Sequence, residues 1–122
     1  MWCRGIRGAT VVTSNTREAI LEAAGELLQK MVEANKVDKE TIASVIFTTT
    51  PDLDAEFPAA AARQRHGWTD VPLLGMQEMK VPGALQRCLR VLIMFNTDKR
   101  LDDIVHVYLR GTEVLRQQDF GR

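Results

Sequence analysis

The sequence predicts an α+β domain in which a mixed β-sheet packs against one long helix and several short ones. Two patterns lead to this prediction. Several short segments rich in Val, Ile and Thr alternate apolar with other residues, which is typical of strands. A single longer segment instead repeats its apolar residues at helical spacing. The 122 residues contain no internal repeat, linker or low-complexity tract, so we expect residues 1–122 to form a single domain.

The amino-terminal part predicts a strand followed by the long helix. Residues 2–13 are mostly β-branched or small and end in a polar cluster, which indicates a strand and then a turn. Asn15 and Glu18 have the spacing of a capping box, so we expect the helix to begin at Asn15 and to run to about Asn35. Its apolar face consists of Ile20, Ala23, Ala24, Leu27, Leu28, Met31 and Val32.

The middle of the chain predicts a second strand and a second helix. Residues 37–41 form a short connection, with one helical turn opened by Asp38. Residues 44–50 predict a strand, and its threonines could either face a site or merely favour the strand. Pro58 can occupy the first position of a short helix over residues 59–66, because a proline there forfeits only an N–H that has no helical partner.

The carboxy-terminal part predicts three further strands. They lie at residues 71–74, 88–95 and 104–109. Pro82 and Gly83 indicate a turn, and one helical turn follows over residues 84–87. We expect the chain to end in a tail that is flexible from about residue 117 to residue 122.

Composition and charge exclude several classes of function. The 16 basic and 16 acidic residues cancel, and no stripe of Lys or Arg is present, which disfavours nucleic acid as a partner. No apolar run approaches the length of a membrane span, and the amino terminus lacks the apolar block of a signal peptide. We therefore expect a cytoplasmic protein. Its cysteines and histidines lack the paired spacing of metal ligands, so we expect no metal site and two buried thiols.

Two arginines in strand segments are the strongest indication of a site. Alternation places Arg90 on one strand face with Cys88, Leu92 and Met94, and Arg7 on a face of small or apolar residues. Burying an unpaired charge is costly, so each guanidinium needs a protein carboxylate or an anionic ligand. The residues alone leave both alternatives open.

Five segments together resemble the AroH-class chorismate mutases. The resemblance extends from Arg4 to Arg116, and five motifs in this order and spacing are specific, although each alone is weak. It implies a homotrimer of pseudo-α/β-barrel shape with active sites between neighbouring subunits. The segments are residues 4–10, 50–59, 76–79, 87–91 and 106–109.

The reaction implied by this resemblance is the Claisen rearrangement of chorismate to prephenate, on the route to phenylalanine and tyrosine. This step involves no proton transfer, covalent intermediate, metal or cofactor. It fits a sequence without an evident nucleophile and base pair. A dianionic substrate needs cations that bind its carboxylates, and arginine binds carboxylates bidentately and keeps its charge when desolvated.

The resemblance also implies roles for individual residues. Arg90 donates to the ether oxygen in the transition state and reaches the enolpyruvyl carboxylate. Arg7 and Tyr108 match ligands of the enolpyruvyl side chain. Glu78 accepts a hydrogen bond from the ring hydroxyl and opposes the charge of the arginines.

Further residues match the walls and rim of the family's site. Phe57, Leu74 and Leu115 form apolar walls that favour the compact substrate conformer. Arg63 and Arg116 match peripheral cations, although Arg63 is equally explained as a surface charge on an alanine-rich helix.

Three positions depart from the family's pattern. Gly75 replaces a small polar residue, and Ala60 replaces a lysine of some members at the cleft rim. Gln117 stands where a proline is usual, which predicts a looser tail.

Two other functions compete with the mutase. One is a trimeric small-molecule-binding or regulatory protein that does not turn over. The other is an enzyme of the trimeric imine-deaminase type, which also holds a substrate carboxylate with an arginine at a subunit cleft.

His106 shares the face of Tyr108 by alternation, and we expect it to pack or pair structurally.

Overall fold

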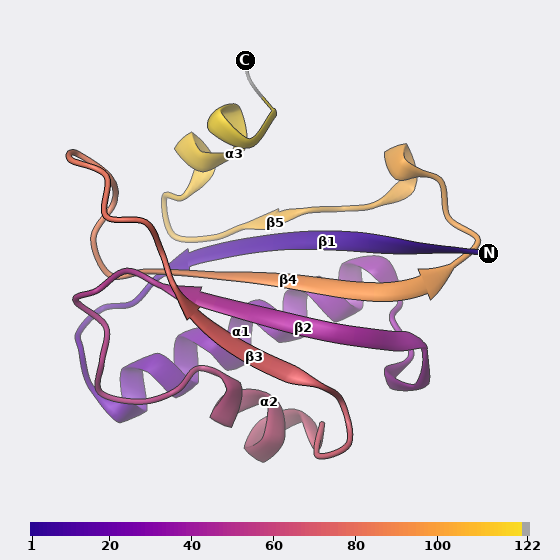
Figure 1. The fold of residues 1–122 in the computed structure, drawn as a ribbon, viewed down its shortest axis with the longest axis horizontal. Coiled ribbons are helices and arrows are strands. Elements are labelled where there is room, and N and C mark those ends of the chain that lie inside the picture. Colours follow the sequence, from indigo (N-terminus) through magenta and orange to yellow (C-terminus); the bar gives the residue numbers. More distant parts are fainter. Residues whose placement is uncertain (121–122) are drawn as a thin grey trace.

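The computed structural model describes the backbone of residues 1–120 and the side chains of residues 1–116. Its centre is one five-stranded mixed sheet, which confirms the predicted α+β class (Figure 1). The strands are β1 (Trp2–Val11), β2 (Ile42–Thr49), β3 (Leu73–Gln77), β4 (Cys88–Thr97) and β5 (Val107–Tyr108). Their order across the sheet is β3-β2-β4-β1-β5.

Strand β4 occupies the middle of the sheet. It pairs antiparallel with β1 along ten positions and with β2 on its other side. The edge strands β3 and β5 add parallel to β2 and β1. This arrangement holds Arg90 in the central strand, where it pairs with Ala9 on one side and Thr48 on the other. Arg7 lies in the strand beside it and pairs with Leu92.

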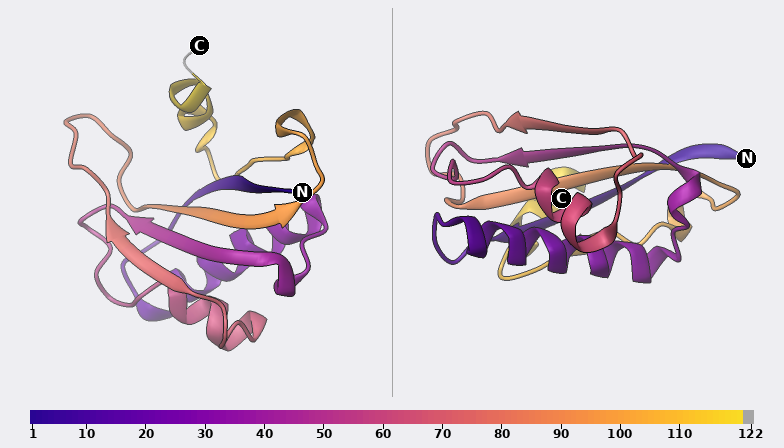
Figure 2. Two further views of the ribbon diagram at one scale, coloured as in Figure 1. Left: turned by 45° about the vertical axis from the view of Figure 1, so that its right-hand side comes forward. Right: turned by 90° about the horizontal axis from the view of Figure 1, so that it is seen from below.

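Two helices cover one face of the sheet. Helix α1 (Arg17–Asn35) and helix α2 (Ala59–His66) lie on the same side, as the two views in Figure 2 show. The core lies between these helices and the sheet. On β4, every second side chain points into it, and Leu89, Val91, Ile93 and Phe95 are buried there. The intervening residues of β4, including Arg90, are only half-buried on the opposite face. Alternation thus placed Arg90 correctly with Leu92 and Met94.

The predicted start of α1 is wrong by one residue. Thr16 is the N-cap, and its hydroxyl accepts a hydrogen bond from the backbone N–H of Ala19 at 3.2 Å. The helix ends as predicted at Asn35, where Lys36 adopts a left-handed conformation with φ of 51°. The predicted turn after Asp38 is also confirmed as the 3₁₀ helix η1 (Lys39–Thr41).

Strand predictions in the second half of the chain need three corrections. Strand β3 begins two residues later than expected and is longer. The helical turn predicted at 84–87 is absent, because Arg87 has φ of 49° and its N–H donates to Asp52. Strand β5 is shorter than expected because the Asn35 side chain bonds both the N–H and the C=O of Val105, at 2.8 Å each.

The carboxy-terminal end contains a helix that the sequence analysis missed. Helix α3 (Glu113–Phe120) follows Gly111, whose φ is 82°. A second 3₁₀ helix, η2 (Leu101–Asp103), precedes β5. The backbone of Gln117 is helical. The side chains of residues 117–120 and the whole of residues 121–122 lie outside the described part of the chain. The flexible tail expected over residues 117–122 therefore stays a prediction. None of the described helices combines the length and apolar character needed to cross a membrane.

Candidate active site

The open face of the sheet brings residues from four strands into one row. Tyr108 on β5 pairs with Ala9 on β1, Ala9 pairs with Arg90 on β4, and Arg90 pairs with Thr48 on β2. Directly paired residues project from the same face of a sheet. The small, fully buried Ala9 side chain therefore lies between Tyr108 and Arg90 in this row.

The next row on this face contains the second arginine. Arg7 pairs with Leu92, Leu92 with Ile46, and Ile46 with Leu74. Arg7 is thus the diagonal neighbour of Arg90, within reach of long side chains. Leu74 lies in the same row but at the far edge of the sheet, where its side chain is exposed. The structure therefore brings the two arginines together and leaves Leu74 apart from them.

Glu78 provides a carboxylate partner for Arg90. Its Oε2 lies 3.7 Å from Nη1 of Arg90, with the two side chains 27% and 28% exposed. The hydroxyl of Thr48 donates to the same Oε2 at 2.6 Å, a length typical of a hydrogen bond to an ionised carboxylate. The backbone N–H of Glu78 is bonded to the carbonyl of Thr49 at 2.9 Å. Glu78 is therefore held at its backbone and at its carboxylate.

A hollow of about 280 Å³ contains these charged groups. Its volume is slightly below the usual range of about 300 to 1,000 Å³ for small-molecule sites. Two guanidinium groups and one carboxylate give it an excess of positive charge, which suits an anionic ligand. Its lining consists of Arg7, Gly8, Ile46, Thr48, Glu78, Arg90, Val91 and Leu92.

The carboxy-terminal segment approaches the same region. Leu115 borders an adjoining hollow of about 390 Å³ together with Glu78 and Arg90. The guanidinium of Arg116 lies 5.8 Å from the centroid of the Tyr108 ring. Tyr108, Leu115 and Arg116 are therefore placed at the Arg90 side of the sheet, as expected for one group of site residues.

His106 supports the backbone beside this site. Its Nδ1 accepts a hydrogen bond from the N–H of Arg7 at 2.9 Å. That bond requires the Nδ1 lone pair, so it fixes the proton of a neutral ring on Nε2. The predicted structural pairing of His106 is confirmed.

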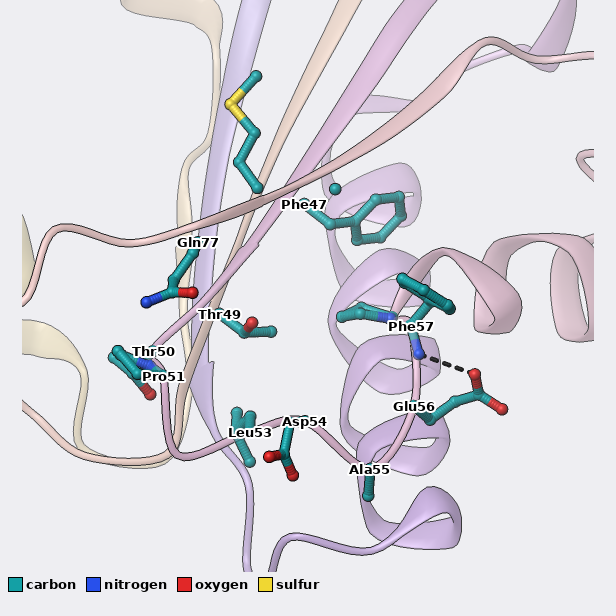
Figure 3. Close-up of a pocket in the computed structure, with 13 residues that line it drawn as sticks. Phe47, Thr49, Thr50, Pro51, Leu53, Asp54, Ala55, Glu56, Phe57 and Gln77 are labelled. Atoms are coloured by element: carbon teal, nitrogen blue, oxygen red, sulfur yellow. Dashed lines mark hydrogen bonds between the residues drawn. The ribbon is translucent and has the colours of Figure 1, made fainter.

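Phe57 and Gly75 lie on the opposite side of the sheet. They line a separate hollow of about 460 Å³ with Phe47, drawn in Figure 3. Gly75 pairs with Phe47, whose side chain faces the helices, so position 75 also faces the helix side. Phe57 is 73% exposed. A Cβ on Gly75 would meet nothing within 4 Å, so the missing side chain leaves open space.

Helix α2 shows where the remaining predicted cation lies. Arg63 is exposed on this helix, on the helix side with Phe57. Ala60 is buried in the core at 5% exposure, so the position does not form an open rim in this chain. One chain therefore separates the predicted site residues into two groups, with Arg7, Glu78, Arg90, Tyr108, Leu115 and Arg116 in the first and Phe57, Arg63 and Gly75 in the second.

The two cysteines occupy different environments. Cys88 is buried beside the arginine site, and burial raises the pKa of its thiol to about 11. Cys3 is exposed, so the expectation of two buried thiols is wrong for this residue. The reason is that Cys3 lies near the end of β1, on the open face of the sheet.

Thr48 is the site residue that sequence reasoning left undecided. Alternation along 44–50 could place its hydroxyl on either face, and only the register with Arg90 shows that it faces the site.

Within the described part of the chain, no group of three or more His, Cys, Asp or Glu side chains is arranged to hold a metal ion.

Comparison with known proteins identifies the family. The family model for chorismate mutase type I matches residues 3–119. The chain belongs to the type I chorismate mutase family. It is similar to the chorismate mutase AroH of Bacillus subtilis (strain 168), with 47% identity over 116 residues that cover 95% of this chain and 91% of the relative. The chorismate mutase AroH of Thermus thermophilus is 54% identical over 114 residues, covering 93% of each chain.

Solved structures agree with the family assignment. The chorismate mutase from Clostridium thermocellum has a TM-score of 0.88 and 49% sequence identity, covering 93% of this chain and 99% of that one. That chorismate mutase therefore shares its fold with this chain over most of the length of both. The family model, over residues 3–119, spans every residue that lines the arginine hollow. Membership in this family disfavours the imine-deaminase alternative.

Proposed function

We propose that this chain is a chorismate mutase that catalyses the Claisen rearrangement of chorismate to prephenate, on the route to phenylalanine and tyrosine. The observation that carries the proposal is the group of Arg7, Arg90 and Glu78 in one hollow on the open face of the sheet. Family membership over nearly the whole chain supports it. A dicarboxylate substrate matches a hollow with two guanidinium groups.

Arg90 is the proposed electrostatic catalyst. As the ether bond breaks, negative charge develops on its oxygen, and a guanidinium placed there stabilises the transition state more than the ground state. Removal of one such donor raises the barrier by about 3 to 4 kcal/mol. The central position of β4 supports this role, because backbone pairing on both sides holds the donor in place before substrate binds.

Glu78 and Arg7 are proposed to orient the substrate. The carboxylate of Glu78 accepts a hydrogen bond from the ring hydroxyl, while the bond from Thr48 holds it in position. Arg7, with Tyr108 beyond the small Ala9 side chain, binds the enolpyruvyl carboxylate bidentately. Holding the substrate in its compact conformer removes much of the entropic part of the barrier.

We also propose a homotrimer in which each active site lies between two subunits. The separation of the site residues within one chain supports this, because Phe57 and Arg90 lie on opposite sides of the sheet. A neighbouring subunit can present Phe57, Arg63 and the β3 edge with Leu74 and Gly75 to the arginine hollow. Apolar side chains such as Trp2 and Met76 are exposed in the single chain, and subunit contact would bury them.

The loss of chorismate absorbance tests the reaction. We expect turnover by the wild type and a fall of about a hundredfold to a thousandfold in kcat for Arg90→Ala. Arg100→Ala is the matched control, because Arg100 is 79% exposed, pairs with Asp102 and follows the end of β4 that is opposite to Arg90. Binding of chorismate without turnover in the wild type would instead establish the regulatory or binding protein.

Subunit mixing tests the shared site. Arg90→Ala and Phe57→Asp subunits are each expected to be inactive alone. Unfolding and refolding them together creates some sites that combine an intact Arg90 with an intact Phe57. Recovery of activity supports the shared site, and no recovery despite mixed oligomers contradicts it.

A further inference from the structure

The loop of residues 54–57 contains the exposed side chain of Phe57. It joins the turn after β2 to α2, with Leu53 buried before it and Pro58 buried after it. Asp54, Ala55 and Phe57 are exposed, and the loop belongs to no strand or helix. Phe57 therefore depends on contacts from elsewhere in the chain for a defined position.

The side chain of Asn15 supplies most of these contacts. Its Oδ1 accepts hydrogen bonds from the backbone N–H of Asp54 at 3.1 Å and of Ala55 at 3.0 Å. Its Nδ2 donates to Oδ1 of Asp54 at 2.7 Å. Because Thr16 caps α1, the Asn15 amide is committed to the loop and not to the helix.

A second link holds the next residue of the loop. Nε of Arg17 donates to Oε2 of Glu56 at 3.0 Å, and the other oxygen of Glu56 accepts from the N–H of Phe57 at 2.8 Å. Figure 3 shows this last bond, with the loop from Asp54 to Phe57 running past α1. The Arg17 side chain is 51% exposed, so this ion pair contributes less than the Asn15 bonds.

We propose that Asn15 is a positioning residue that sets where Phe57 stands as the wall of a neighbouring subunit's active site. This inference rests on the proposed function. Three bonds from one amide fix the two residues at the start of the loop, and the rigid α1 transmits its own position to Phe57. A small displacement of a group that orients substrate lowers the rate strongly.

The first measurement is independent of turnover. Hydrogen–deuterium exchange of the whole protein follows the amides of Asp54, Ala55 and Phe57. In Asn15→Ala we expect the amides of Asp54 and Ala55 to exchange about tenfold faster or more, because their acceptor is gone. The amide of Phe57 keeps its acceptor on Glu56, so we expect it to exchange faster through loosening of the loop. Gln29→Ala is the control, since it removes an exposed amide that bonds Glu33 at 2.8 Å and has no bond to the loop. Unchanged exchange in Asn15→Ala overturns the proposal.

The second measurement is a kinetic double-mutant cycle with Phe57. We expect Asn15→Ala to lower kcat/KM for chorismate by about tenfold in the intact oligomer. If Asn15 acts through Phe57, adding Asn15→Ala to Phe57→Ala lowers kcat/KM no further. Equal losses in both backgrounds overturn the proposal, as does wild-type kcat/KM in Asn15→Ala.

Exchange of the two side chains provides a rescue. Asn15→Asp alone sets a carboxylate against that of Asp54, where the present separation is 2.7 Å, and we expect a loss similar to that of Asn15→Ala. Adding Asp54→Asn restores the donor and the acceptors in reversed positions, so kcat/KM should return to within about twofold of wild type. If the double variant regains slow amide exchange in the loop but its kcat/KM stays low, the link to Phe57 is overturned. Absence of wild-type turnover refutes the proposed function and this role together, whereas fast turnover with an ineffective Asn15→Ala refutes only this inference.

Discussion

Replacement of Thr48 by valine isolates the hydrogen bond that holds Glu78. Valine has nearly the shape of threonine, so Thr48→Val removes the hydroxyl without opening a cavity. The lost bond is short, at 2.6 Å, and its acceptor is a carboxylate that is about three-quarters shielded from water. Hydrogen bonds to charged groups contribute about 1.5 to 3 kcal/mol, and partial exposure favours the lower end.

The expected loss follows from that magnitude. If the bond serves to hold Glu78 in its working position, about 1.5 kcal/mol appears in the activation barrier. This corresponds to a decrease of about tenfold in kcat/KM. Since Arg90 itself is unchanged, the loss should be much smaller than that of Arg90→Ala.

The assay is the initial rate of chorismate consumption across substrate concentrations, with circular dichroism to verify the fold. Ser44→Ala is the matched control, because it removes a hydroxyl from the same face of β2 whose contact is the sulfur of Met94 at 3.8 Å. We expect the control to retain wild-type kcat/KM. A folded Thr48→Val enzyme within twofold of wild type, or a control equally impaired, would refute the reasoning.

Three further changes test the surroundings of the site. Gly8→Ala should lower the free energy of unfolding by about 1 to 3 kcal/mol, because its Cβ would overlap the buried sulfur of Met31. In urea titrations, Met31→Ala should therefore cost less in the Gly8→Ala background than in the wild type. Cys88 should resist iodoacetamide at pH 8 until the protein is unfolded, because a pKa of about 11 leaves only about 0.1% thiolate in the native state. Gly75→Ser should keep or raise the free energy of unfolding, by up to about 1 kcal/mol, since the new side chain enters open space and restricts the unfolded chain; a large decrease in the denaturation midpoint would contradict the open space.

Elements with strong local signals were predictable from the sequence. Helix α1 follows from apolar residues at helical spacing, and its end at Asn35 was correct. The cap was misplaced because Asn15 and Thr16 are both suitable, and the choice depends on bonds from Asn15 to Asp54 and Ala55, about 40 residues away. Local spacing contains no information about such a partner.

The short and irregular elements depended on distant residues. Residues 104–109 have the composition of a strand, yet Asn35 binds the backbone of Val105 and leaves only Val107–Tyr108 in the sheet. Residues 84–87 lack a helix because Asp52 accepts the N–H of Arg87 in a left-handed conformation. Tertiary hydrogen bonds overrode local propensity in both segments.

The sequence by itself determined the fold class, the family resemblance and the face on which Arg90 projects. These depend on composition, motif order and the alternation of side chains, which are properties of consecutive residues. Only the tertiary structure decided that Thr48 holds Glu78 against Arg90, and that Phe57 lies on the other side of the sheet. The register between strands and the packing of loops set these neighbours, and both arise from contacts between residues far apart in the chain.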